Sequence, residues 1–404
     1  MNHVVVVGAG QAGAALVARL RTEGFTGQIT LIGAEKVPPY QRPPLSKAYL
    51  LGDMTQERLY LRPPAFYADQ DIKLRLDVSV TAIDPAAKTL TLSDAQVLHY
   101  DQLALTTGAE PHRLPAKIGG ALGNVFTMRD LADADAIAPA FAPGRKVLIV
   151  GGGYIGLEAA AVASKRGLDV TLVEMADRIL QRVAAPETSD YFRALHQSHG
   201  VRILEGTGLK ELRGNDTVTG AVLTDGTEIA VDFVVVGVGV KPATALAEAA
   251  GLEVSNGITT DDFGRSSDPH IWAAGDCASC LFEGERIRIE SVGNAIAQAE
   301  AVACNILGAN SPYQPKPWFW SDQYDCKLQI AGLNLGYTDV YMRKGDAPGV
   351  QSNWYFNGPR LIAVDAMNDP RNYMIGKRLI EAGRSPAPAA LVDPATDMKA
   401  LLRA

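Results

Sequence analysis

The chain has 404 residues and is 47% hydrophobic, which is enough for two or three domains with buried cores. Its 38 basic and 45 acidic residues give a net charge of −7, which argues against a general nucleic-acid binder. No stretch approaches the roughly 20 apolar residues of a membrane helix, the N-terminus does not resemble a signal peptide, and four cysteines do not make a disulfide scaffold. We therefore expect a soluble cytoplasmic protein that binds neither nucleic acid nor membrane.

Two segments of the chain repeat one pattern. Residues 4–7 form a β-branched run without alternation, as in a parallel strand buried on both faces. This run leads into the motif Gly8-Ala9-Gly10-Gln11-Ala12-Gly13, a helix over 14–20 and a strand over 29–32. The pattern recurs as a strand over 146–150, the motif Gly151-Gly152-Gly153-Tyr154-Ile155-Gly156, a helix over 157–166 and a strand over 170–173.

Further elements follow in chain order. We predict strands over 103–108, 233–239 and 271–276, an alanine-rich helix over 292–307 and a proline-rich linker over 311–317. Beyond the linker, the sequence predicts antiparallel strands over 327–333, 349–356 and 360–365, and a helix near 374–382. The expected fold class is α/β, with two Rossmann-like three-layer nucleotide-binding domains plus a C-terminal α+β domain.

The two glycine motifs predict binding of dinucleotides. The first glycine makes the tight turn, the second lets the backbone approach a pyrophosphate, and the third packs helix against strand. The helix that follows then presents unpaired N–H groups to the phosphates. One such motif could be a glycine-rich turn of an ordinary α/β domain, but here two motifs each follow a buried strand and precede a helix.

The acidic residues that follow the motifs differ. Glu174 comes 18 positions after Gly156 (174 − 156), directly after a strand, and suits a ribose 2′-hydroxyl, which selects NAD. In the first unit the equivalent position is Gly33, and the carboxylate comes two residues later as Glu35. Glu35 is therefore either a ribose ligand or a solvated loop acid.

Several segments in combination carry a resemblance to known families. The two repeats and residues 271–276 resemble the two-dinucleotide flavoprotein superfamily. The segment Pro39-Tyr40-Gln41-Arg42-Pro43-Pro44-Leu45-Ser46-Lys47 and the stretch 364–380 resemble the ferredoxin reductases of bacterial cytochrome P450 and ring-hydroxylating dioxygenase systems. This resemblance implies an FAD domain of residues 1–113 and 243–316, an inserted NAD domain of residues 114–242, and a C-terminal domain of residues 317–404.

The resemblance also implies roles for single residues. Lys47 would lie beside flavin N5, and Glu158 would pair with it and meet the nicotinamide, which makes these two the catalytic candidates. Asp276 would hold the ribitol, and Trp320 would close one side of the isoalloxazine unless it only packs at a domain seam. The implied FAD ligands are Gly8, Gly10, Ala12, Gly13, Glu35, Arg42, Lys47, Val80, Arg129, Asp276, Val292 and Trp320. The implied NAD ligands are Gly151, Gly153, Ile155, Gly156, Glu174, Arg182, Gly237, Gly239 and Glu290, and no metal site is expected.

The cysteines narrow the activity. No cysteine precedes Cys277, so the chain lacks both the early pair of disulfide reductases and the single thiol that related oxidases carry where Lys47 stands. Cys277 and Cys280 form a CxxC that could be a redox pair, but it directly follows Asp276, and two cysteines are too few for structural zinc or an iron–sulfur cluster.

Without a thiol acceptor, the resemblance implies that an NADH-dependent FAD protein passes electrons one at a time to a [2Fe–2S] ferredoxin. That ferredoxin would serve a cytochrome P450 or another oxygenase. The alternatives are a rubredoxin reductase, another NADH-dependent flavin reductase, or a redox-gated interaction flavoprotein of the apoptosis-inducing-factor branch. The ferredoxin would dock over the exposed flavin edge, near Trp320 and the C-terminal domain. The cations nearest in sequence to this docking face are Arg286, Arg288, Lys316 and Lys327.

Overall fold

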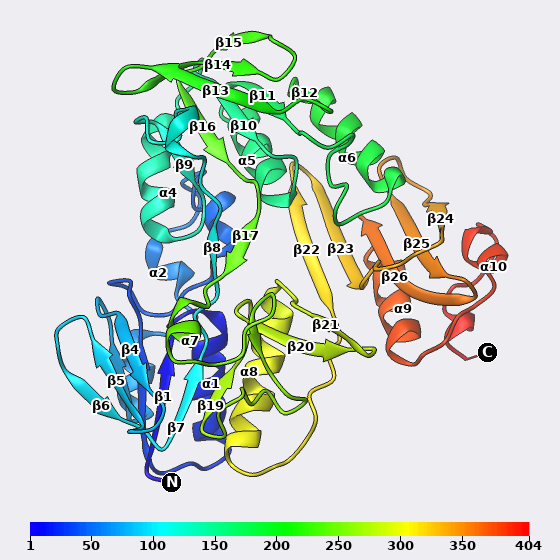
Figure 1. The fold of residues 1–404 in the computed structure, drawn as a ribbon. Coiled ribbons are helices and arrows are strands. Elements are labelled where there is room, and N and C mark those ends of the chain that lie inside the picture. Colours follow the sequence, from blue (N-terminus) through cyan, green and yellow to red (C-terminus); the bar gives the residue numbers. More distant parts are fainter. Residues whose placement is uncertain (404) are drawn as a thin grey trace. The chain divides into compact units, whose positions relative to one another are not determined.

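A computed structural model describes residues 1–403 and divides the chain into two compact units (Figure 1). Unit 1 consists of Met1–Gln41, Gln56–Glu110 and Lys241–Pro317, and unit 2 of Arg42–Thr55, Pro111–Val240 and Trp318–Ala404. The ranges expected for NAD binding and for the C-terminal domain thus fall largely in one unit. The segment from Arg42 to Thr55 belongs to that unit as well.

Unit 1 is built on a five-stranded sheet in which every strand pairs parallel to its neighbour. The strand order is β19 (Ile271–Ala273), β7 (Gln102–Leu105), β1 (His3–Val7), β2 (Gln28–Ile32) and β3 (Ile72–Arg75). Helices α1 (Gln11–Thr22) and α8 (Val292–Ile306) run side by side in Figure 1 and bury one apolar cluster with this sheet. The predicted helices and central strands of the first repeat are therefore confirmed.

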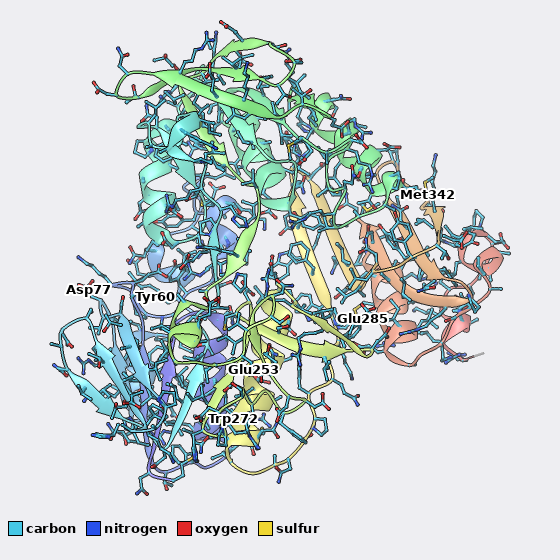
Figure 2. The ribbon with its side chains drawn as sticks, viewed as in Figure 1. Tyr60, Asp77, Glu253, Trp272, Glu285 and Met342 are labelled. Carbon is cyan, nitrogen blue, oxygen red and sulfur yellow. The ribbon has the colours of Figure 1, made fainter. Side chains whose placement is uncertain are left out.

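A second apolar cluster contains other residues of the parallel strands. It also contains residues of the antiparallel strands β4 (Val80–Asp84), β5 (Thr89–Leu92) and β6 (Val97–His99) and of helix α7 (Ala245–Ala249). Unit 1 also contains α2 (Gln56–Leu59), α3 (Pro64–Asp69), β18 (Ile258–Thr259), β20 (Ala278–Phe282) and β21 (Glu285–Ile287). Strands β8 (Ala109–Pro111) and β17 (Val240–Pro242) pair with each other. Trp272, labelled in Figure 2, is buried on β19 and donates from Nε1 to Gln102 Oε1 at 2.6 Å.

Unit 2 repeats the parallel sheet. Its order is β12 (Arg202–Leu204), β11 (Asp169–Val173), β10 (Lys146–Val150), β16 (Phe233–Val236) and β9 (Val125–Thr127). The sequence β12-β11-β10-β16 matches β3-β2-β1-β7 of unit 1, which confirms the duplication predicted from the sequence. The helices of this part are α4 (Leu131–Ile137), α5 (Tyr154–Lys165) and α6 (Pro186–Ser198), and a three-stranded sheet of β13 (Leu209–Gly214), β14 (Val218–Leu223) and β15 (Glu228–Ala230) shares its apolar cluster.

The C-terminal part of unit 2 is an antiparallel sheet with two helices. The strand order is β22 (Trp318–Gln323), β23 (Cys326–Gly332), β26 (Arg360–Met367), β25 (Gln351–Asn357) and β24 (Asp339–Lys344). Helices α9 (Pro370–Glu381) and α10 (Pro388–Val392) pack against it. The α+β prediction is confirmed, but β22 and β24 were not predicted. β22 directly follows the proline-rich linker, and β24 is an edge strand whose exposed Met342 is labelled in Figure 2.

A buried polar cluster joins α6 to the C-terminal sheet within unit 2. Asp365 on β26 accepts hydrogen bonds at Oδ2 from the Thr188 hydroxyl, at 2.7 Å, and from the Tyr355 hydroxyl. Tyr355 also accepts from the backbone N–H of Ala185, the N-cap residue of α6. The C-terminal sheet therefore holds the first turn of α6, which follows the loop that carries Glu174.

Opposing protonation of His196 and Asp365 should shape acid stability. Burial lowers the pKa of His196 from 6.5 to about 4 and raises the pKa of Asp365 from 3.8 to about 6. As pH falls from 6.5 to 4, the unfolded chain protonates His196 while the folded chain does not, so the free energy of unfolding falls by about 3 kcal/mol. As pH falls from 6 to 3.8, folded Asp365 gains its proton first, so stability rises by about 3 kcal/mol.

Because these contributions oppose each other, single variants should reveal them. Relative to the unmodified protein, Asp365→Asn should lose about 3 kcal/mol of stability between pH 7 and 4, and His196→Asn should gain about as much. Urea unfolding at four pH values measures both differences. Stability differences that stay constant with pH in both variants would contradict the two shifts.

None of the helices in residues 1–403 has the length and apolarity that a membrane crossing requires.

Candidate functional site

The first glycine turn has the geometry of a phosphate-binding loop. Gly8 has φ +110°, and a Cβ on Gly13 would lie 2.1 Å from the Gly8 carbonyl oxygen, so both positions require glycine. A Cβ on Gly10 would meet nothing within 4 Å, which leaves the backbone open to a ligand. No side chain of residues 1–403 caps α1, which begins after Gly10 and carries Ala12 in its first turn. These residues fit a pyrophosphate at the helix N-terminus.

The second turn reproduces this geometry in unit 2. Gly151 has φ +108°, a Cβ on Gly156 would lie 2.1 Å from the Gly151 carbonyl oxygen, and Gly153 again opens to free space. Helix α5 follows Gly153, with no side-chain cap in the described part of the chain, and its Ile155 is 39% exposed. Gly237 approaches Gly156 closely, since its Cβ would lie 3.4 Å from the Gly156 nitrogen. This turn therefore fits a second dinucleotide.

The acidic residues after the turns are held in different ways. Glu174 Oε2 accepts from the Gly152 N–H at 2.7 Å, and Oε1 accepts from the Ala176 N–H at 2.8 Å, so the carboxylate lies at the second turn. Glu35 is half-buried and accepts from the buried Tyr40 hydroxyl at 2.6 Å. A Cβ on Gly33 would lie 2.6 Å from the Ala9 Cβ, which explains why the first unit has no side chain at the position that Glu174 takes in the second.

The predicted ion pair between Lys47 and Glu158 is confirmed. Lys47 Nζ lies 2.9 Å from Glu158 Oε1, and the two side chains are only 17% and 6% exposed. Lys47 follows a short 3-10 helix, Pro43–Ser46, and Glu158 lies on α5. Ser46 donates to Glu158 Oε2 at 2.8 Å, and Ser321 on β22 donates to Oε1 at 2.6 Å. Three donors from two other segments of unit 2 therefore fix this carboxylate.

The other candidates divide between the units. Unit 1 holds Val80, the first residue of β4, Asp276 after β19, and Val292, the first residue of α8. Glu290, expected to bind NAD, also lies in unit 1 and pairs with Arg288 at 2.5 Å. Unit 2 holds Arg42 and Arg129, and the Arg42 guanidinium donates to the Arg129 carbonyl oxygen at 2.9 Å. It also holds Arg182, whose guanidinium lies beside Gly239.

The aromatic residues 318–320 alternate between the two faces of β22. Trp318 and Trp320 share one face and stack with ring centroids 5.5 Å apart, while Phe319 on the other face packs against Tyr154 at 4.8 Å. Lys377 Nζ lies 5.6 Å from the centroid of the Trp318 ring. Trp318 is therefore explained by packing between a ring and a cation, and the half-buried Trp320 lies beside it on the same face.

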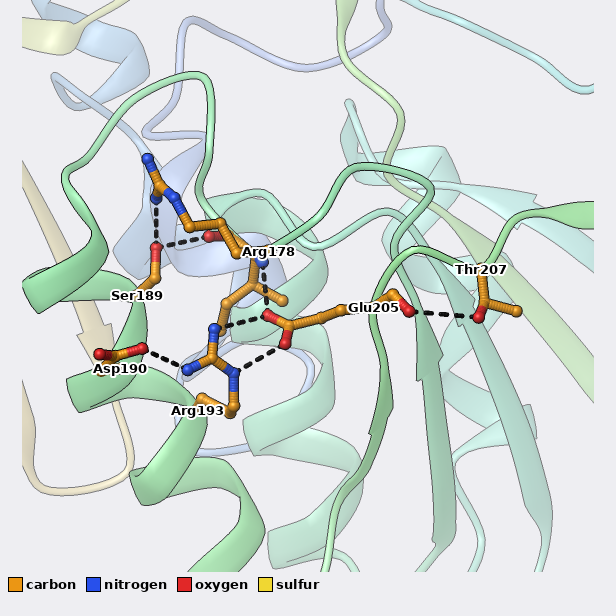
Figure 3. Close-up of polar contacts among 7 residues, drawn as sticks. Arg178, Ser189, Asp190, Arg193, Glu205 and Thr207 are labelled. Carbon is orange, nitrogen blue, oxygen red and sulfur yellow. Dashed lines mark hydrogen bonds and ion pairs between the residues drawn. The ribbon is translucent and has the colours of Figure 1, made fainter.

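The loop after β11 is held by a polar network shown in Figure 3. Glu205 accepts from the Ile179 N–H at 2.7 Å and binds Arg193 in a bidentate pair at 2.8 and 2.9 Å. Arg178 donates to the Ser189 hydroxyl at 2.5 Å, which in turn donates to the Ile179 carbonyl at 2.6 Å. The guanidinium of Arg178 is therefore hydrogen-bonded to α6.

Comparisons with known proteins agree with this geometry. A family described as pyridine nucleotide-disulphide oxidoreductase matches residues 2–299, and a family described as reductase C-terminal matches residues 318–402. The chain belongs to the pyridine nucleotide-disulphide oxidoreductase family. The match spans both glycine turns and the Lys47–Glu158 pair of this oxidoreductase.

Similar proteins cover nearly the whole oxidoreductase. Rhodocoxin reductase of Rhodococcus erythropolis is 41% identical over 399 residues, which cover 98% of this chain and 93% of that protein. Putidaredoxin reductase of Pseudomonas putida is 40% identical over 411 residues, with coverage of 100% and 97%. The crystal structure of the covalent putidaredoxin reductase–putidaredoxin complex matches with a TM-score of 0.96 at 40% identity, covering 100% of this chain and 98% of that one.

The cysteines of this oxidoreductase are unpaired despite the family's name. All four are free, and Cys277, Cys280 and Cys326 are buried. Burial raises the pKa of the Cys277 and Cys280 thiols, so both stay protonated near neutral pH and are poor nucleophiles. Cys277 Sγ lies 3.4 Å from the Leu105 carbonyl oxygen within the core of unit 1.

We therefore expect the cysteines to be dispensable for electron transfer. Cys277→Ala and Cys280→Ala should lower stability by removing buried atoms, but turnover from NADH to ferricyanide per bound FAD should stay within about twofold, since no thiolate takes part. If the Cys277→Ala protein still binds FAD but loses turnover, the result would indicate a disulfide reductase.

Sequence reasoning missed four residues of this site. Ser46 directly precedes Lys47, so its position offered a local signal, whereas Ser321 lies 163 positions from Glu158 and offered none. Glu205, directly after β12, and Arg193 on α6 fix the loop after β11. No spacing in the sequence connects them to the glycine turn.

Proposed function

We propose that this oxidoreductase holds FAD, takes electrons from NADH, and passes them one at a time to a [2Fe–2S] ferredoxin that serves a cytochrome P450 or other oxygenase. The observation that carries the proposal is the buried Lys47–Glu158 pair, in a chain with no cysteine before Cys277. The relatives named for reducing rhodocoxin and putidaredoxin support it, because they are similar over almost the whole chain.

The proposal assigns the two glycine turns to different cofactors. Residues 1–113 and 243–316 would form the FAD domain, 114–242 the NAD domain, and 317–404 the C-terminal domain. Bound FAD would supply the conversion of one two-electron donation into two one-electron steps. The turn at Gly8 and the helix N-terminus of α1 would bind one pyrophosphate, and the turn at Gly151 the other. A cytoplasmic location is part of this proposal.

The remaining candidates keep the roles that the resemblance implies. Lys47 and Glu158 would orient the flavin and the nicotinamide, and Glu174 would accept the ribose hydroxyls. The further FAD ligands would be Glu35, Arg42, Val80, Arg129, Asp276, Val292 and Trp320. The further NAD ligands would be Ile155, Arg182, Gly237, Gly239 and Glu290.

A basic surface of the C-terminal part suits an acidic ferredoxin. Arg378, Lys399 and Arg403 are exposed around a cavity of about 610 Å³ that Met374 and Leu402 also line. Cations around an apolar centre resemble the usual arrangement of a transient protein interface. In contrast, Arg286 donates to the Ser279 carbonyl and Arg288 pairs with Glu290, so these two docking candidates from the sequence are committed to internal contacts.

Charge reversal on this surface should slow ferredoxin association. Arg378→Glu with Lys399→Glu should lower the association rate by about tenfold at low salt and flatten its salt dependence, because steering depends on complementary charge. Turnover from NADH to ferricyanide should not change. Lys210→Glu, an exposed reversal on β13, is the matched control. An equal effect of the control would contradict docking at this surface.

One assay tests the proposed function as a whole. Purified protein should release free FAD when denatured, and NADH oxidation should drive reduction of a protein acceptor such as cytochrome c strongly only when a [2Fe–2S] ferredoxin is present, whereas ferricyanide accepts electrons directly. Equal or faster turnover with rubredoxin would favour a rubredoxin reductase. Rapid NADH consumption without either carrier would indicate a general flavin reductase, and negligible NADH turnover would indicate an interaction flavoprotein.

A further inference from the structure

A chain of buried hydrogen bonds ends on the Glu158 carboxylate. Tyr324 Oη lies 3.4 Å from His196 Nδ1, and His196 Nε2 lies 2.8 Å from Gln323 Oε1. Gln323 Nε2 donates to Ser321 Oγ at 3.1 Å, and Ser321 donates to Glu158 Oε1 at 2.6 Å. His196, Gln323 and Ser321 are each 0% exposed, so water does not compete for these groups.

The carboxylate fixes the direction of the bonds from Ser321 to His196. Ionised Glu158 only accepts, so the one hydroxyl hydrogen of Ser321 points to it. Ser321 can then only accept from Gln323, which turns the Gln323 carbonyl toward His196. His196 must donate from Nε2, and its unprotonated Nδ1 accepts from Tyr324. Burial keeps the imidazole neutral near pH 7 by lowering the pKa of His196 to about 4, and this leaves Nδ1 without a proton.

The polarity of the chain has an electrostatic consequence. Each donor presents the positive end of its dipole toward Glu158, and aligned hydrogen bonds strengthen one another in a medium of low dielectric constant. The chain therefore stabilises negative charge at the oxygen that also binds Lys47. The Gln323 amide in the middle of the chain makes it a poor route for protons, but the chain still restrains the Glu158 carboxylate.

We propose that Ser321, Gln323 and His196 are positioning residues that hold Glu158, and through it Lys47, in place for the reaction with the nicotinamide and the flavin. The proposal rests on the proposed function. Without Ser321, Oε1 of Glu158 keeps Lys47 as its remaining described donor. The carboxylate can then rotate more freely about its Cγ–Cδ bond, although Ser46 still donates to Oε2.

A purely structural role would give a different pattern. Polar side chains between α6 and β22 could serve only to satisfy one another, and their loss would then change stability alone. Ser164 on α5 provides the comparison, because its hydroxyl donates to the His199 carbonyl at 2.9 Å and lies beside Tyr324, at the end of the chain farthest from Glu158. Ser164→Ala removes one hydroxyl from this region and leaves Glu158 untouched.

Stopped-flow reduction of the FAD-loaded protein by NADH tests the proposal. Ser321→Ala should lower the limiting rate of flavin reduction by about tenfold, which equals about 1.4 kcal/mol, while the Kd for NADH changes by less than about twofold. Ser321→Thr retains the hydroxyl and should restore most of the rate. Gln323→Leu removes the next link and should give a smaller loss in the same direction.

Two readouts do not depend on turnover. The flavin absorption maximum and the flavin reduction potential should shift in Ser321→Ala and stay unchanged in Ser164→Ala. Nitrogen NMR of the six histidines should also show His196 as the neutral Nε2–H tautomer between pH 6 and 8.

The outcomes separate this proposal from the proposed function. If the unmodified protein fails to oxidise NADH, the proposed function fails. If it oxidises NADH while Ser321→Ala matches Ser164→Ala in rate, spectrum and potential, only the positioning role is overturned. A Ser321→Thr variant that remains as slow as Ser321→Ala overturns it as well, and so does a neutral His196 protonated at Nδ1 in place of Nε2. If Ser321→Ala does not fold, Gln323→Leu decides by the same measures.

Discussion

Replacing Lys47 with methionine is expected to slow the reduction of bound flavin by NADH by at least about 100-fold. The ion pair with Glu158 is buried, and removal of one partner leaves a charge without its counterion, at a typical cost of about 3–5 kcal/mol. A 100-fold loss of rate corresponds to about 2.7 kcal/mol, so it requires only part of that cost to appear in the transition state. Stopped-flow reduction at saturating NADH measures it.

Two variants separate catalysis from stability in this experiment. Lys210→Met removes an exposed lysine of β13 and should leave the rate unchanged. Lys47→Met combined with Glu158→Leu replaces the pair with apolar groups, which often restores the stability that a single replacement loses. Reduction should remain slow in the double variant. Recovery of the rate together with stability would show that the pair only holds the fold.

NADH should be preferred over NADPH by at least about 100-fold in kcat/KM, or about 2.7 kcal/mol. The carboxylate of Glu174 is fixed by the N–H groups of Gly152 and Ala176, so it cannot easily turn away from a 2′-phosphate. Two unit charges about 4 Å apart repel by roughly 4 kcal/mol at an effective dielectric constant near 20, and solvent screening removes part of this.

Substitutions on one loop check this preference. Glu174→Ala should reduce the NADH:NADPH ratio mainly by weakening NADH, since it removes the acceptor of the ribose hydroxyls. Asp177→Ala removes an exposed carboxylate three positions further along the loop and should leave the ratio unchanged. The ratio of kcat/KM values is measured with a single-electron acceptor. A ratio near one in the unmodified protein would show that Glu174 does not line the ribose pocket.

Local sequence signals predicted the fold more fully than the site. The turns at Gly8 and Gly151, their flanking strands and helix α8 were predicted because spacing and burial patterns act over a few residues. Strand β22 was missed because Trp318 follows a proline-rich segment and the buried residues in the second half of the strand, Ser321 and Gln323, are polar.

The partners of the candidate residues depended on contacts between distant segments. The Lys47–Glu158 pair was predicted through a family resemblance, whereas Ser321 reaches Glu158 across 163 positions and required the structure. Gly33, at the position that Glu174 takes in the second unit, had no explanation in the sequence. The structure provides one, because Ala9 of the neighbouring turn fills the space beside Gly33.

The composition of unit 2 determines which pieces could be exchanged between relatives. Glu158 lies in the inserted part, but its donors Ser46, Lys47 and Ser321 come from the segment before that part and from β22 after it. A chimera that replaces only residues 114–242 would combine the glutamate of one parent with the Ser46, Lys47 and Ser321 of the other. It would preserve these contacts only if both parents place the glutamate in the same position. Recombination is therefore expected to succeed when residues 42–55, 111–240 and 318–403 travel together as one inherited block.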